Sequence, residues 1–139
     1  MTITGRDGAK LGDAWRGGME ALLGTTVAGF PNLFLLTGPN TGLGHSSMVL
    51  MIESQIPYVL DAMNTVDRHR ATAIDTVRER QDDFNTEVQA KLEKAVWSQG
   101  GCGSWYLDEH GRNRTLWPGA TFTYRRRTRR IDPADHVLL

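Results

Sequence analysis

The residues best suited to chemistry lie in a glycine-rich stretch, residues 38–47, which reads GPNTGLGHSS. Glycines let a backbone approach a ligand closely because no side chain intervenes. A helical pattern begins at Ser46, and the N-terminus of a helix offers unpaired N–H groups and a partial positive charge. An apolar run, LFLL at 33–36, comes shortly before the stretch. A strand, a glycine-rich loop and a helix in this order are typical of a turn that binds a phosphate or a cofactor.

The stretch matches neither of the two best-known phosphate-binding motifs in full. No lysine follows the glycines, so it is not a Walker A loop. The spacing Gly42-x-Gly44-x-x-Ser47 approaches the dinucleotide fingerprint, but serine replaces the third glycine and no acidic residue ends a second strand. Two interpretations stay open: a helix N-terminus that faces a cofactor, or a loop that lets a helix pack tightly.

The surrounding patterns predict the elements that position this loop. The run 33–36 predicts a strand buried on both faces. A helix is predicted from Ser46 to Asn64, kinked at Pro57, with one apolar face formed by Met48, Ile52, Gln55, Ile56, Val59 and Met63.

Further along the chain, a short strand is predicted within 72–77 and an amphipathic helix from Gln81 to Trp97. The runs 104–107 and 121–124 alternate like strands and predict a β-hairpin. The basic run 125–130 is interpreted as a solvated edge strand, and the tail after it is expected to be frayed. We find no internal repeat and no internal domain boundary.

Composition excludes several classes of protein. The chain has 139 residues, of which 40% are hydrophobic and 23% charged, as in an ordinary globular domain. Sixteen basic residues balance sixteen acidic ones, so no net charge attracts nucleic acid or an anionic membrane. One cysteine, Cys102, cannot form an internal disulfide, and no signal peptide or membrane-spanning run of about 20 apolar residues is present. A cytoplasmic protein without a metal site is expected.

Three blocks of sequence carry a family resemblance. Residues 29–41 read GFPNLFLLTGPNT, followed by GHSS at 44–47 and IESQ at 52–55. These resemble the C-terminal part of Baeyer–Villiger monooxygenases, which are class B flavoprotein monooxygenases that use FAD and NADPH. The segment GRDG at 5–8 resembles what precedes this block in the family. The segments VW at 96–97, SWY at 104–106 and WPG at 117–119 resemble the closing part of the 4-hydroxyacetophenone and cyclohexanone branches.

The resemblance implies an incomplete fold. It predicts an α/β piece (α+β when isolated): the last strand, loop and helix of a Rossmann-like FAD domain, with a C-terminal helix and a β-hairpin. The family is several times longer, and its GxGxxG motifs and its His/Trp fingerprint do not occur in this chain. We therefore expect residues 1–139 to be a single incomplete domain, the C-terminal part of a ketone-oxygenating enzyme, without a catalytic residue and inactive alone.

The resemblance also assigns the site. In the family this helix points its N-terminus at the pyrimidine end of the flavin, where reduced flavin carries negative charge. The cofactor-binding residues that this implies are Gly38, Pro39, Asn40, Gly44, Ser46, Ser47 and Met48. The residues that it implies on the substrate side are Leu43, His45 and Met48.

The expected partners follow from this assignment. They are the flavin and a small ketone, with either a second copy of the chain or a missing N-terminal half. The alternative is a non-catalytic interaction or dimerisation module derived from the same fold. A third, weaker possibility is an unrelated small α+β ligand-binding domain.

Overall fold

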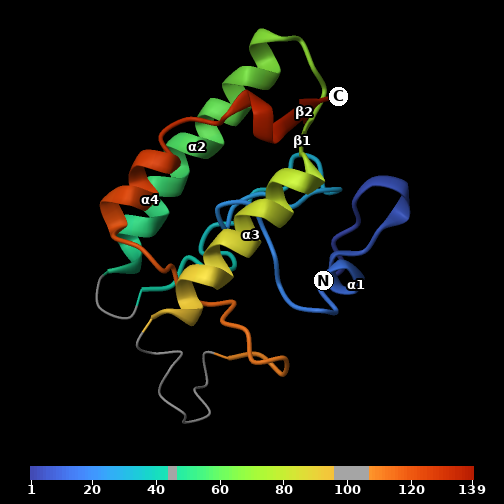
Figure 1. The fold of residues 1–139 in the computed structure, drawn as a ribbon. Coiled ribbons are helices and arrows are strands. Elements are labelled where there is room, and N and C mark those ends of the chain that lie inside the picture. Colours follow the sequence, from blue (N-terminus) through green and yellow to red (C-terminus); the bar gives the residue numbers. More distant parts are fainter. Residues whose placement is uncertain (44–46, 96–106) are drawn as a thin grey trace.

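The computed structural model describes residues 1–43, 47–95 and 107–139. Three helices dominate it: α2 (Met48–Arg68), α3 (Arg78–Glu93) and α4 (Thr121–Arg127). Figure 1 shows α4 alongside α2, with α3 in front of a set of irregular segments. The N-terminal region adds the single-turn helix α1 (Leu11–Ala14) and the 3-10 turn η1 (Arg6–Gly8).

The sheet consists of two short antiparallel strands. Strand β1 (Ile74–Thr76) pairs with β2 (His136–Leu138), so that Ile74 faces Leu138 and Thr76 faces His136. A 3-10 turn, η2 (Pro133–Asp135), leads into β2. The pairing joins the C-terminus to the middle of the chain, which contradicts the frayed tail expected from the sequence.

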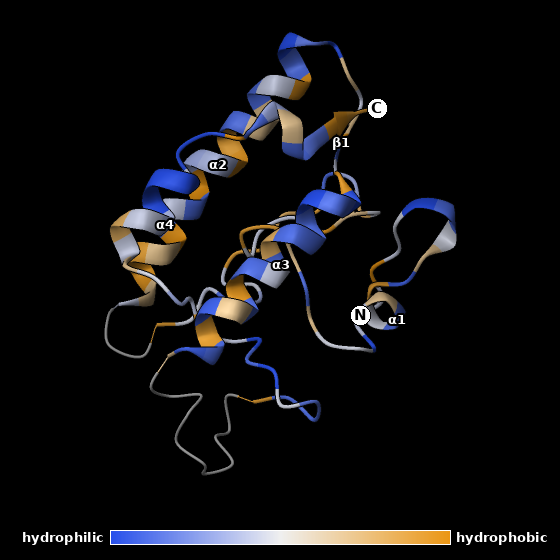
Figure 2. Cartoon of the chain, in the orientation of Figure 1, coloured by the Kyte–Doolittle hydropathy of each residue, from blue (hydrophilic) through white to orange (hydrophobic). Residues whose placement is uncertain are grey.

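The core lies between α2, α3 and an irregular segment, residues 21–28, that is buried throughout. Helix α3 is mostly hydrophilic with apolar patches (Figure 2), and its buried residues include Phe84, Val88 and Leu92. The main cluster of buried apolar side chains comprises Leu22, Leu23, Met51, Tyr58, Phe84, Val88, Leu92, Leu116, Trp117 and Tyr124.

Buried backbone outside regular structure needs other hydrogen-bond partners, since unpaired groups are costly. Side chains from the helices and β1 provide them here. Gln81 Oε1 accepts from Ala28 N at 2.8 Å, and Asn85 Nδ2 donates to Ala21 O at 3.2 Å. The Tyr124 hydroxyl donates to Leu23 O at 2.6 Å. The interior is therefore irregular backbone held by polar side chains.

Two of the predicted elements are wrong. Residues 33–36 form no strand: the segment is irregular and bends at Leu36, and Leu35 N donates to Thr25 O at 2.7 Å. A strand needs a neighbouring strand with which to form backbone hydrogen bonds, and the described part of the chain supplies none there. Residues 121–124 belong to α4, so no hairpin forms with them, and the first three arginines of the basic run, Arg125 to Arg127, are the last turn of that helix. The other half of the expected hairpin falls largely on residues 96–106, outside the described residues.

The helix predictions are confirmed, with shifted bounds. Helix α2 begins two residues after the predicted start and ends four residues beyond Asn64, with Pro57 inside it. Its buried face consists of Met51, Ser54, Gln55, Tyr58 and Ala62, so only Gln55 of the predicted face is fully buried. Of the predicted face, Ile56 and Met63 are 43% and 53% exposed. The mixed α/β class itself is confirmed. In the described part of the chain, no helix has the length and apolarity to span a bilayer.

Candidate cofactor groove

The turn after residue 36 adopts a backbone shape that few sequences allow. Thr37 and Asn40 have φ values of +58° and +57°, in the left-handed region. A Cβ atom on Gly38 would lie 2.2 Å from the Gly24 carbonyl oxygen, so only glycine fits. The Thr41 hydroxyl donates to the Gly38 carbonyl at 2.7 Å and closes the turn. Close packing against the backbone therefore explains the first glycine.

The second half of the turn is held by residues 113–117. Asn40 is buried, and its Nδ2 donates to the carbonyls of Asn113 and Leu116 at 2.8 and 2.9 Å. Gly42 N donates to Thr115 O at 2.7 Å, and a Cβ atom on Gly42 would lie 2.7 Å from the same oxygen. The Asn40 side chain thus points into the protein, where it anchors the turn.

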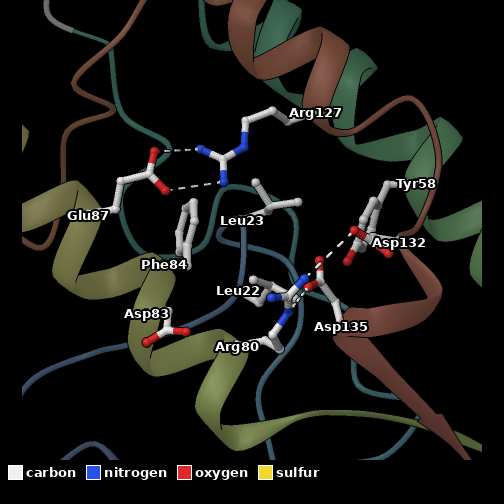
Figure 3. Close-up of a pocket in the computed structure, with 10 residues that line it drawn as sticks. All are labelled: Leu22, Leu23, Tyr58, Arg80, Asp83, Phe84, Glu87, Arg127, Asp132 and Asp135. Atoms are coloured by element: carbon white, nitrogen blue, oxygen red, sulfur yellow. Dashed lines mark hydrogen bonds and ion pairs between the residues drawn. The ribbon is translucent and has the colours of Figure 1, made fainter.

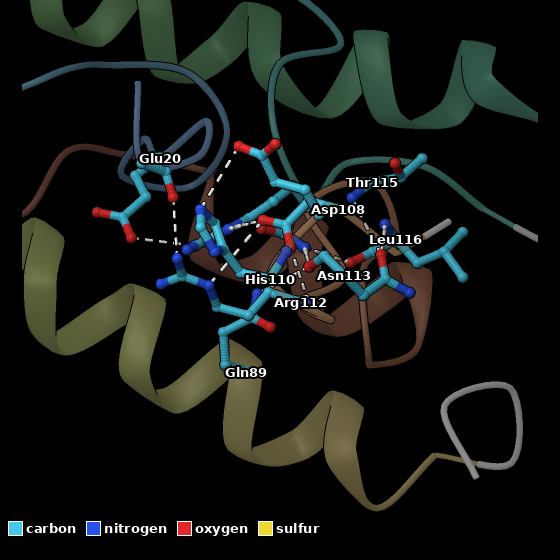
Figure 4. A network of polar contacts seen from close by, with 12 residues as sticks. Glu20, Gln89, Asp108, His110, Arg112, Asn113, Thr115 and Leu116 are labelled. Atoms are coloured by element: carbon cyan, nitrogen blue, oxygen red, sulfur yellow. Dashed lines mark hydrogen bonds and ion pairs between the residues drawn. The ribbon is translucent and has the colours of Figure 1, made fainter. Parts of the chain in front are cut away.

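The segment 107–116, which accepts the hydrogen bonds from Asn40, is itself held by side-chain-to-backbone hydrogen bonds (Figure 4). Asn113 Oδ1 accepts from the backbone N–H groups of Thr115 and Leu116, both at 3.0 Å. Asp108 Oδ1 accepts from the N–H groups of His110 and Arg112, both at 2.9 Å. Burial raises the pKa of Asp108, but these backbone hydrogen bonds and the nearby arginines lower it more, so its pKa lies below the usual range.

Helix α2 begins beside the turn. Ser47 is its N-cap, with an exposed side chain whose Oγ accepts from Val49 N at 3.2 Å. Met48, the first helical residue, is half-buried against the main core cluster, as is Leu43. The predicted site residues Gly44, His45 and Ser46 lie outside the described residues.

A groove of about 490 Å³ joins these features. Three of the predicted cofactor-binding residues line it: Gly38, Pro39 and Met48. Its other lining residues come from three segments, and they are Trp15, Met19, Leu35, Leu36, Thr37, Thr41, Gly42, Arg114 and Thr115. The lining is mostly apolar, and the first turn of α2 borders it, so the groove suits a flat apolar ring with a polar edge.

Gln55 was not predicted to have this role. Its side chain is fully buried in α2, and Oε1 accepts from Thr37 N at 2.9 Å. Nε2 donates to Thr25 Oγ1 at 2.9 Å and to the carbonyls of Gly24 and Leu35 at 3.2 and 3.3 Å. The sequence did contain a signal for this role: Gln55 is an amide among apolar residues on one predicted helix face, and a buried amide needs hydrogen-bond partners.

A second cleft, of about 390 Å³, lies between α3, α4 and the C-terminal segment (Figure 3). Arg127 pairs with Glu87 at 3.1 Å and lies over the Phe84 ring, 5.2 Å from its centroid. Arg80 pairs with Asp135 at 2.8 Å. Burial raises the pKa of Glu87, but hydrogen bonds from Lys91 and Arg127 bring it below its usual value. These charged groups pair with one another, so we interpret the cleft as part of the packing and not as a binding site.

No protein-family model matches the chain. It is 53% identical over 137 residues to a Baeyer–Villiger monooxygenase of Pseudomonas aeruginosa, covering 98% of this chain and 26% of that protein. A Baeyer–Villiger monooxygenase of Streptomyces coelicolor is 49% identical over 138 residues, covering 99% of this chain and 27% of that protein.

Solved structures agree. An oxidized steroid monooxygenase bound to NADP superimposes with a TM-score of 0.82 at 28% identity, covering 99% of this chain and 26% of that one. The crystal structure of OTEMO in complex with FAD and NADP shares the fold, with a TM-score of 0.83 at 22% identity, over 100% of this chain and 26% of that one. The predicted resemblance is confirmed: the chain is related to Baeyer–Villiger monooxygenases along its length and spans about a quarter of the curated relatives.

Proposed function

We propose that this chain forms the flavin-facing, C-terminal part of an FAD- and NADPH-dependent monooxygenase of Baeyer–Villiger type. The reaction would insert one oxygen atom beside the carbonyl of a small ketone. One observation carries the proposal: Gly38, Pro39 and Met48, assigned to the cofactor from the sequence, line a single groove at the start of α2. The relatives named above support the reaction type.

The groove fits a flavin edge in shape and charge. The N–H groups in the first turn of a helix lack partners within the helix, and they stabilise negative charge. Val49 N already donates to Ser47 Oγ at 3.2 Å and Leu50 N to Ser47 O at 3.2 Å, so a flavin would have to displace these bonds or use Met48 N. FAD, when bound, supplies the redox and oxygen chemistry. The chain's residues would orient its ring, give donors to its pyrimidine edge and exclude water with the apolar lining.

The remaining assignments form part of the same proposal. Gly44 and Ser46 would approach the flavin through their backbones. Leu43 and His45 would lie on the substrate side together with Met48.

A chimera tests the proposal. This chain replaces the corresponding quarter of the Pseudomonas aeruginosa relative, and the purified protein is examined for flavin absorbance and for ketone-stimulated NADPH oxidation. We expect a yellow protein that turns over, while the chain alone gives no NADPH oxidation above the free-FAD background. A folded chimera without bound FAD would contradict the proposal, as would turnover by the chain alone.

A pair of variants locates the flavin in this chimera. Met48→Glu places a carboxylate in the groove and should weaken FAD binding by about tenfold or more, because a carboxylate is costly to bury against an apolar ring and displaces apolar contact. Asn64→Glu adds the same charge at an exposed site near the C-terminal end of α2, away from the groove, and should leave FAD affinity unchanged. Equal effects of the two changes would place the flavin elsewhere.

A second candidate function rests on the outer face of α2. Val49, Ile56, Leu60 and Met63 are each between 43% and 57% exposed along this face. Such a stripe favours an interface, either with the remaining part of the fold or with a second copy. If the chain acts as an interaction module, the chain alone should associate in sedimentation velocity without any flavin. The chimera should then be a colourless protein.

A further inference from the structure

We infer that Arg114 is a positioning residue of the groove. Its buried guanidinium and its backbone together connect the two walls, which are the turn at residues 37–42 and the loop at residues 15–20. The inference rests on the proposed function, because it concerns the groove assigned above to the flavin. Arg114 is 4% exposed, yet it lines both the groove and the neighbouring surface cleft that contains Glu20 and Arg112. A buried arginine between two openings separates them and fixes their shared wall.

The backbone of Arg114 holds the cofactor turn. Its carbonyl accepts from Asn40 N at 2.9 Å, next to the bonds that Asn40 Nδ2 makes to Asn113 and Leu116. Any shift of Arg114 therefore moves Asn40, and with it Pro39, which lines the groove.

The side chain of Arg114 holds the opposite wall. Nη1 lies 3.0 Å from Glu20 Oε1, and Nε lies 3.6 Å from Asp108 Oδ2. Gly18 lies directly against the guanidinium, since a Cβ atom there would come within 3.0 Å of Nε. The loop that carries Gly18 and Glu20 also carries Trp15 and Met19, which line the groove from this side.

Within the described part of the chain, the loop has few other polar ties to this region. Trp15 Nε1 donates to Glu20 O at 2.8 Å, which closes the loop on itself. Arg112 Nη2 donates to Gly17 O at 2.9 Å from a more exposed position. A buried charge without partners is strongly unfavourable, so the Arg114 guanidinium, Glu20 and Asp108 must stay together. The distance between the loop and the turn, and hence the width of the groove, depends on this cluster.

The first test is independent of flavin. Amide hydrogen exchange is measured on the full chain for Asn40 and Gly42, which donate to the backbone of residues 114 and 115. Arg114→Met should speed exchange at both amides by about tenfold or more, because the segment that accepts from them is released. Arg127→Met, which removes an arginine paired with Glu87 in the other cleft, is the matched control and should leave both amides unchanged.

The second test uses the chimera. Arg114→Met should weaken FAD binding by about tenfold and shift the flavin absorption band, while Arg127→Met does neither. If Arg114→Met does not fold, Arg114→Lys decides: it keeps the charge but not the planar fork, and should give a smaller change in the same direction. Unchanged Asn40 and Gly42 exchange in a folded variant would overturn the inference. A wild-type chimera without FAD would instead overturn the proposed function, whatever the exchange data show.

Discussion

Replacing Gln55 by leucine tests whether a buried amide holds the cofactor turn. The change keeps the side-chain volume and removes every hydrogen bond. The N–H of Thr37 loses its acceptor, and the oxygens of Gly24, Thr25 and Leu35 lose a donor. Gln55 is fully buried, and its bonds to Gly24 and Thr25 are buried as well, so water cannot replace these two partners without opening the packing around them.

The expected cost follows from these contacts. A buried donor without an acceptor costs about 1–3 kcal/mol, and the three acceptors add to this. Burying the additional apolar surface of leucine returns about 1–2 kcal/mol. The net destabilisation is then about 3 kcal/mol, a large part of the 5–15 kcal/mol that is typical of a folded domain. For a chain of this length, it lowers Tm by about 10 °C.

The assay is thermal unfolding of the full chain followed by far-UV circular dichroism. Asn64→Leu makes the same chemical change at an exposed position of the same helix, and its Tm should stay within about 2 °C of the wild type. A Gln55→Leu Tm that also stays within that range would refute the reasoning, because the four contacts would then contribute nothing to the fold.

Three other predictions follow from the described residues. Gly38→Ala should lower the free energy of unfolding by about 3 kcal/mol or more in a denaturant titration, because the new Cβ would meet a backbone carbonyl at 2.2 Å. Gly12→Ala is the control: its Cβ would meet no atom within 4 Å, so the free energy of unfolding should not change. Burial lowers the pKa of His136, so the folded state favours the neutral ring and stability should fall as the pH drops below about 6.5; His136→Gln should flatten this part of a plot of Tm against pH between 5 and 8. The chain alone should self-associate through the outer face of α2, and the double change Ile56→Glu and Met63→Glu should yield a monomer in sedimentation velocity; a wild-type monomer at micromolar concentration would contradict this.

The helices could be predicted because their apolar spacing is local. The bounds of α2 and α3 differ from the prediction by a few residues, since caps and not periodicity set where a helix begins and ends. The apolar face of α2 was placed wrongly because the helix has apolar residues on two sides. Sequence spacing alone does not tell which of the two meets the core.

The strands were harder because their partners lie far away in the chain. Residues 33–36 have the composition of a buried strand, but no neighbouring strand exists for them in the described chain. Residues 121–124 have strand-forming types, yet they form a helix. There Tyr124 donates to Leu23 O and packs edge-on against Trp117, so tertiary contacts override the local preference. Likewise β2 exists only because it pairs with β1.

The glycine-rich turn was found from the sequence because it needs glycine where the backbone approaches Gly24 and Thr115. The residues that hold it in place, Gln55 and Arg114, were not found, because Gln55 bonds to groups 18 to 31 residues away and Arg114 pairs with the distant Glu20. Only the fold brings these partners together.

The way the interior is built explains why such residues matter for the groove. In a sheet, the backbone ladder fixes a loop at the end of a strand. Here the segments that lead into the groove are irregular, and amides such as Gln55, Gln81 and Asn85 supply the hydrogen bonds that a ladder would give. Most substitutions of such a side chain remove its hydrogen bond, whereas a ladder bond is lost only when proline is introduced. Substitutions of buried polar residues on α2 and α3 should therefore alter the turn, and with it the groove, more than substitutions of equally buried apolar residues of similar size.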